Sequence, residues 1–303
     1  MFAGNKNGIK RSHLHDSEIR TAWLFCAPAI LLIGIFVLIP FCMSVGYSFT
    51  NQMLVPRKGF QLRFSGLENY IKIFTSATTL NSFKNTFVYA LLVVPATLLL
   101  GTLLAMLVNR PMRGVKIFRM IYFSPQVVTM TVVAVVWSFI LSSNSEGIMN
   151  SVLGLFGIAP QRWLQDTHLA LFCIAIMYIW QSLGLQMLII LGGLQYISED
   201  LYEAAVIDGC NSWNKFWNIT VPGLKNTLIY VFVSTTISSL KLFTQVYMLT
   251  EGGPQNSTTT VVYTLYKAGF INGQLGYSSA ISVVFFILVF AISRTQNKIL
   301  GED

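Results

Sequence analysis

Charged side chains are scarce in this sequence. Its 303 residues include 20 Lys or Arg and 12 Asp or Glu, only 11% of the chain, whereas 54% are hydrophobic and the mean hydropathy is +0.62. Soluble domains carry about 25% charged residues. Too few charges remain to cover a surface that faces water, so the composition excludes an ordinary soluble domain and predicts an integral membrane protein.

Cysteine and histidine are also rare. The four cysteines have no C-x-x-C spacing, and three of them lie in apolar runs. This pattern argues against a disulfide framework or a metal site and favours small buried apolar residues. Two of the three histidines fall in the N-terminal tail, and the three together make no metal-binding set.

Motifs for catalysis and nucleotide binding are missing. The chain has no G-x-x-x-x-G-K-[ST], no H-E-x-x-H and no G-x-S-x-G. We therefore predict no catalytic residue, no metal and no cofactor bound by this chain itself. The net charge of +8 could suggest nucleic acid, but the basic residues lie in short segments between apolar runs, where they orient membrane spans. We expect no nucleic-acid partner.

What the chain has in abundance is long apolar runs. About 20 apolar residues cross a bilayer as a helix. The sequence predicts six such helices and hence an all-α membrane protein; the runs are 22–49, 85–108, 118–141, 168–195, 225–249 and 277–297. Residues 1–21 and 300–303 are the expected tails of a single transmembrane domain that covers 22–299.

Basic residues favour one orientation. With both termini in the cytoplasm, the inner segments hold twelve Lys or Arg and the outer segments seven, while Lys241 falls within a span. Positively charged loops tend to stay inside. Loop 196–224, between the fourth and fifth spans, is therefore expected to face the cytoplasm.

The sequence of loop 196–224 predicts two short helices joined by a turn. Ser198 can cap a first helix, Gly209 can end it in a left-handed conformation, and Ser212 can cap a second. Trp213, Phe216 and Trp217 would then share one aromatic face. On physical grounds the loop is either an interfacial anchor resting on lipid headgroups or a docking element for a cytoplasmic partner.

The loop sequence resembles a known family signature. "EAAVIDG" (203–209) followed by "WNKFWNITVPGL" (213–224) is similar to the EAA signature of permease subunits in binding-protein-dependent ABC importers. The similarity covers roughly residues 20–300 and is typical of the carbohydrate-uptake branch, in particular the first permease of a pair, as in maltose, glycerol-phosphate and lactose uptake. It also rests on "FSGLENYIKIF" (64–74), "FRMIYFSPQVV" (118–128), "GGLQYISEDLYEAA" (192–205) and "LTEGGPQNSTTTVVYTLY" (249–266).

This resemblance implies a function and a set of partners. It implies import of a sugar or sugar derivative across a bacterial cytoplasmic (inner) membrane by alternating access. The partners would be a second permease, two ATPase subunits that bind ATP and Mg²⁺, and an extracytoplasmic solute-binding protein. The helix between spans four and five would be the coupling helix that docks on the ATPase, with the implied residues Glu203, Ala204, Ala205, Asp208 and Gly209.

A polar stripe on the fifth span is a candidate substrate path. Thr227, Tyr230, Ser234, Ser238, Lys241 and Gln245 are spaced 3, 4, 4, 3 and 4 residues apart, which places them on one helical face. They would either bond a hydroxylated solute or serve as interhelical packing, with Lys241 snorkelling to headgroups. The fourth span adds Tyr178, Trp180, Gln181 and Gln186.

An ion-coupled secondary transporter of a polar solute is the alternative, because six helices alone do not exclude it. Such transporters usually hold acidic residues inside their spans. The predicted spans contain no Asp or Glu, which counts against ion coupling.

Overall fold

The protein is described by a computed structural model that covers residues 13–56, 58–110 and 113–301. In this part of the chain every regular element is a helix, and the only β-type pairing is an isolated bridge between Thr50 and Phe64. The all-α prediction is therefore confirmed for these residues. Most of the expected N-terminal tail (residues 1–12) and residues 302–303 lie outside the described part.

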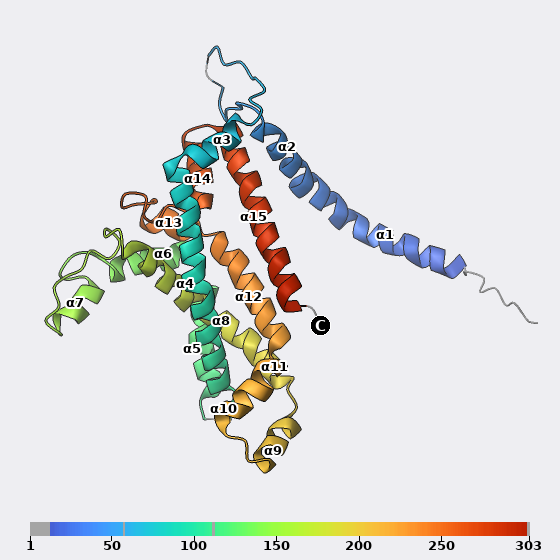
Figure 1. Cartoon of the computed structure of the whole chain (residues 1–303), viewed down its shortest axis with the longest axis vertical. Helices are drawn as coiled ribbons and strands as arrows, with labels where there is room; N and C mark the ends of the chain where they lie inside the picture. The colour runs from blue at the N-terminus through green and yellow to red at the C-terminus, as the bar shows by residue number, and fades with distance from the viewer. Residues whose placement is uncertain (1–12, 57, 111–112, 302–303) are drawn as a thin grey trace, which may run out of the picture.

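The first apolar run forms one long helical rod, whose C-terminal part packs against the bundle and whose N-terminal part stands apart from it (Figure 1). It consists of α1 (His13–Ile33), the π-helical η1 (Gly34–Leu38) and α2 (Ile39–Ser48). Figure 1 shows it leaving the rest of the chain at an angle, with α2 as the attached end. None of the residues in its most apolar stretch is buried by the other residues that the structure describes.

Three further helices are long and apolar enough to cross a membrane: α4 (Ala77–Val108), α8 (Ala170–Gln195) and α15 (Leu275–Gly301). The most extensive packing joins α4 to α8. Ala105, Met187, Ile190 and Leu194 are buried in one cluster between these two helices. In this part of the chain the apolar runs therefore predicted the spans well.

The prediction that the third span, 118–141, is a single helix is wrong. α5 (Val115–Val127) and α6 (Met130–Ile140) meet at an angle of 100°. Val128 and Thr129 are extended between them, with ψ of 136° and 143°. The amide nitrogen of Gln181 in α8 donates to the carbonyl of Val128 at 3.0 Å, which compensates for a helical hydrogen bond that the bend removes.

The fifth expected span, 225–249, is also interrupted. α12 (Lys225–Leu240) ends before Lys241, and α13 (Thr244–Leu249) follows after a break. The hydroxyl of Thr260, distant in sequence, donates to the carbonyl of Leu242 at 2.8 Å. That contact satisfies a backbone acceptor in the break, so the helix can stop without leaving the group unpaired.

Most of the remaining elements lie toward the two ends of the bundle, whereas α7 lies to one side of it (Figure 1). Figure 1 places α3 and α14 at one end and α9 and α10 at the other. Their bounds are α3 (Glu68–Thr75), α7 (Ile148–Gly154), α9 (Glu199–Ile207), α10 (Ser212–Lys215), η2 (Phe216–Thr220), α11 (Val221–Gly223), α14 (Val261–Tyr266) and η3 (Lys267–Ile271).

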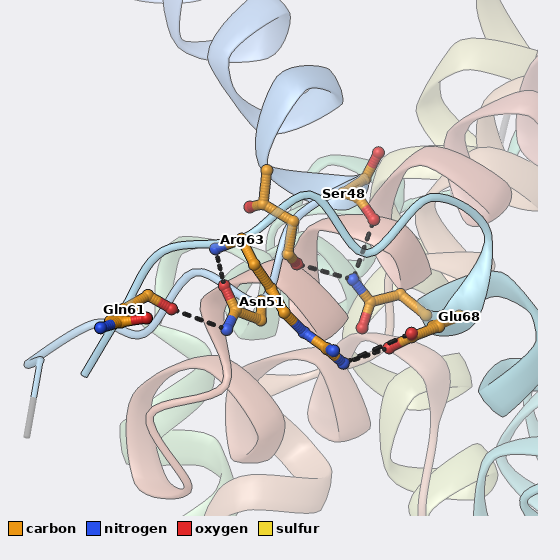
Figure 2. A network of polar contacts seen from close by, with 7 residues as sticks. Ser48, Asn51, Gln61, Arg63 and Glu68 are labelled. Carbon is orange, nitrogen blue, oxygen red and sulfur yellow. Dashed lines mark hydrogen bonds and ion pairs between the residues drawn. The ribbon is translucent and has the colours of Figure 1, made fainter. Parts of the chain in front are cut away.

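A polar network fixes the loop between α2 and α3. Figure 2 shows Asn51, on one side of the loop, bonded to the other side: its amide donates to Gln61 O at 3.1 Å, and its carbonyl oxygen accepts from Arg63 N at 2.8 Å. The guanidinium of Arg63 pairs with the carboxylate of Glu68 at 3.0 Å. The loop is thereby tied to the start of α3.

Candidate functional site: the α9–α10 element and the cavity between α8 and α12

Helix α9 begins as its sequence predicts. The side chain of Ser198 accepts a hydrogen bond from Asp200 N at 3.3 Å, and acidic residues occupy the first turn, where they favour the positive end of the helix dipole. Glu203 and Ala204 are exposed, whereas Ala205 is 7% exposed and faces inward. Of the three EAA residues, the first two are thus available to another protein.

The turn after α9 depends on glycine. Asp208 is exposed at the end of the helix, and Gly209 follows with φ of +75°. The amide of Cys210 then donates to Ala205 O at 2.8 Å. No atom lies within 4 Å of a Cβ built at Gly209, so the need for glycine comes from the backbone conformation and not from crowding.

The second helix begins one residue earlier than expected. Asn211, and not Ser212, is its cap, and the side-chain oxygen of Asn211 accepts from Asn214 N at 2.8 Å. Asn is as good a cap as Ser, so the sequence alone could not separate the two. The predicted aromatic face forms, although the helix is π-helical from Phe216; the Phe216 and Trp217 rings lie 5.1 Å apart, and those of Trp213 and Trp217 5.7 Å.

One hydrogen bond ties α9 to the second helix. The hydroxyls of Tyr202 and Thr220 are 2.9 Å apart. Leu201, Val206 and Ile207 nevertheless leave 54%, 60% and 86% of their surface exposed. The α9–α10 element therefore presents aliphatic side chains beside the exposed Glu203 at the end of the bundle.

A polar cavity of about 340 Å³ lies between α5, α8 and α12. Three of the predicted path residues, Tyr178, Gln181 and Ser238, line it together with Gln126 and Gln186. The side-chain carbonyl oxygens of Gln181 and Gln186 are buried and have no hydrogen-bond partner among the described residues. Buried acceptors usually find a donor, so this cavity is suited to a ligand rich in hydroxyl groups.

The rest of the predicted stripe does not reach this cavity. Tyr230 is 61% exposed and Ser234 is half-buried along α12. Lys241 is exposed just beyond the end of α12, and Gln245 is 5% exposed on α13. The prediction of one continuous helical face is therefore wrong beyond Ser238, because the helix breaks before Lys241.

Comparison with known proteins decides the family. The family model "Binding-protein-dependent transport system inner membrane component" matches residues 97–300, more than half of the chain. The chain belongs to this family.

Relatives of the permease match it over nearly its whole length. The lactose transport system permease protein LacF of Rhizobium radiobacter is 33% identical over 292 residues, which cover 94% of this permease and 96% of LacF. The trehalose/maltose transport system permease protein MalF of Thermococcus litoralis is 31% identical over 290 residues, covering 95% and 96%. The resemblance found in the sequence motifs is thereby confirmed.

A solved structure shares the fold of the permease. A chain of a bacterial ABC transporter involved in the import of the acidic polysaccharide alginate aligns with a TM-score of 0.80 and 21% identity, covering 94% of the permease and 97% of that chain. At this identity the match concerns the fold alone.

Several contacts that shape the permease site were not predicted. Gln126 and Ser182 line the cavity between α8 and α12, but neither stands out in the sequence. Gly184 lets α5 approach α8, since a Cβ at this position would lie 2.7 Å from Phe123 Cα and would meet the carbonyl of Tyr122. A glycine in a span is a usable sign of close helix packing, whereas its partner helix cannot be read from sequence.

Proposed function

We propose that this permease is one transmembrane subunit of an ATP-driven importer that passes a sugar or sugar derivative from an extracytoplasmic binding protein to the cytoplasm. The observation that carries the proposal is the family match, together with relatives whose names specify lactose and trehalose/maltose transport. Alternating access of the site between the two sides of a bacterial cytoplasmic membrane is the proposed mechanism.

The α9–α10 element is the proposed coupling site. Because the described chain has no nucleotide-binding motif, energy would come from ATP and Mg²⁺ bound to a separate ATPase. Leu201, Val206 and Ile207 supply exposed apolar area and Glu203 an exposed charge, a combination suited to insertion of α9 into a groove of that ATPase. Gly209, which follows the end of α9, would set the direction in which the chain leaves this helix.

The cavity between α8 and α12 is the proposed substrate station. Its side-chain amides and hydroxyls can exchange hydrogen bonds with sugar hydroxyls, and the ring of Tyr178 offers an aromatic face. Lys241, at the start of the break, and Gln245, beyond it on α13, would act at an outer station, where an ammonium favours an anionic sugar. Tyr230 and Ser234 would line the path below the cavity.

Two further partners complete the proposed importer. A second permease would cover the exposed face of the rod formed by α1 and α2, since no residue in the most apolar stretch of the rod is buried by the described chain. The binding protein is suggested by the alginate transporter, which was solved in complex with a periplasmic protein bound to alginate pentasaccharide. Six membrane crossings, with the bent α5–α6 pair and the broken α12–α13 pair each counted as one, would place both termini and α9 in the cytoplasm.

Reconstitution tests the proposal. The chain is co-expressed with the products of neighbouring genes, purified, and placed in liposomes that contain ATP, with the binding protein outside. We expect accumulation of labelled sugar only when ATP, ATPase and binding protein are all present. Uptake by the chain alone, driven by a proton or sodium gradient, would instead establish the ion-coupled alternative.

A further inference from the structure

A second cavity lies at the end of the bundle opposite α9. It has a volume of about 340 Å³ and is formed by α3, the start of α4, η3 and the start of α15. Lys72 and Lys267 line it together with side-chain hydroxyls and amides, and none of the described residues that form it is Asp or Glu. The cavity therefore combines two positive charges with many neutral hydrogen-bonding groups.

The ammonium group of Lys72, the first of these charges, contacts neutral groups. The Nζ of Lys72 donates to Gln274 Oε1 at 3.0 Å and lies 4.3 Å from the centre of the Tyr277 ring. An ammonium has three donors, so it can still bond an anion in the cavity. Glu68, one turn earlier on α3, is bonded instead to Arg63, as Figure 2 shows.

The second charge and a buried hydroxyl complete the site. Lys267 is exposed at the start of η3 and takes part in no ion pair recorded within the described chain. Thr264, one turn before it, lines the same cavity; the residue is only 9% exposed, and its hydroxyl has no partner among the described residues. Such a buried hydroxyl normally has a protein or ligand partner.

We propose that this cavity binds a small hydroxylated anion of the uronic-acid class. The carboxylate would lie between Lys72 and Lys267, and the sugar hydroxyls would bond the threonine and amide side chains. An Asp or Glu side chain inserted by a partner protein would satisfy the two ammonium groups but would bring no hydroxyl groups to the rest of the cavity. The proposal rests on this cavity alone and stands whether or not the transported solute is a sugar.

Binding of D-glucuronate tests the site. The full chain, purified with its partner subunits in nanodiscs and without the binding protein, is titrated calorimetrically with D-glucuronate, D-glucose and acetate. Glucuronate should bind more tightly than either of the others, because it alone has both the charge and the hydroxyl groups. Lys72→Gln and Lys267→Gln should each weaken glucuronate binding about tenfold, as expected for one charge-assisted hydrogen bond.

Lys84→Gln is the matched control, because Lys84 is an exposed lysine of α4 that does not line the cavity, and it should leave binding unchanged. Three results would overturn the proposal. The first is no binding of glucuronate by the wild-type complex. The second is loss of glucuronate binding in Lys241→Met but not in either cavity variant. The third is unchanged glucuronate binding in the cavity variants together with weaker attachment of the binding protein when that protein is added in a separate titration. The last result would assign the lysines to an acidic side chain of that protein.

Discussion

Substitution of Gly184 by alanine should separate α5 from α8, the two helices whose contact forms one wall of the proposed substrate cavity. An added Cβ would lie 2.6 Å from the carbonyl carbon of Tyr122 and 2.7 Å from Phe123 Cα, whereas ordinary contacts begin near 3.4 Å. These are backbone atoms, so no side-chain rotation relieves the overlap. α5 would have to move by about 1 Å relative to α8, and overpacking of this kind costs roughly 1–3 kcal/mol of folding stability.

The same displacement would stretch the hydrogen bond from Gln181 to Val128 O, which is now 3.0 Å long. Gly184→Ala should therefore lower both the unfolding midpoint of the purified protein and the rate of sugar uptake. Gly192→Ala is the matched control on α8, since nothing lies within 4 Å of its Cβ and alanine favours a helix by up to about 1 kcal/mol over glycine. If both variants are equally stable and active, the close approach of α5 and α8 is not as described.

Three further predictions concern the proposed coupling element and path. Gly209→Val should lower ATP-dependent uptake by disturbing the left-handed turn, while Gly209→Asn should lower it less because Asn tolerates positive φ; equal effects in uptake assays would contradict this. Cysteine at Ala204, which is exposed, should crosslink to the ATPase more readily than cysteine at the buried Ala205, and equal yields on denaturing gels would place α9 elsewhere. Lys241→Met should reduce uptake of an anionic sugar about tenfold more than uptake of a neutral one, as for loss of one charged hydrogen bond; identical effects on the two sugars would remove Lys241 from the path.

The apolar runs predicted the straight spans because length and hydropathy are local properties. The two failures, at Val128 and at Lys241, occur where groups distant in sequence satisfy the backbone. Gln181 bonds Val128 O across 53 residues, and Thr260 bonds Leu242 O across 18. The hydropathy of one apolar run does not show which distant side chains will bond its backbone. Each run therefore predicted a continuous helix.

The same reasoning explains the mixed result for the site residues. The Ser198 cap and the Gly209 turn depend on neighbours within a few residues and were predicted from sequence. The cavity residues Tyr178 and Ser238 meet across two helices, and only the fold shows that they meet while Gln245 does not. The predicted roles of these residues in coupling and transport remain predictions.

The exposed apolar surface of the α1–α2 rod has a consequence for biogenesis. α2 packs against α15, but no residue of the most apolar stretch of the rod is buried by the described chain, so the span can insert early during synthesis and gains little further packing energy until another helix reaches it. Chains made in excess of a partner would therefore display an unsatisfied helix to membrane quality-control proteases. With the proposed second permease as that partner, the cellular abundance of this chain should follow the abundance of the second permease.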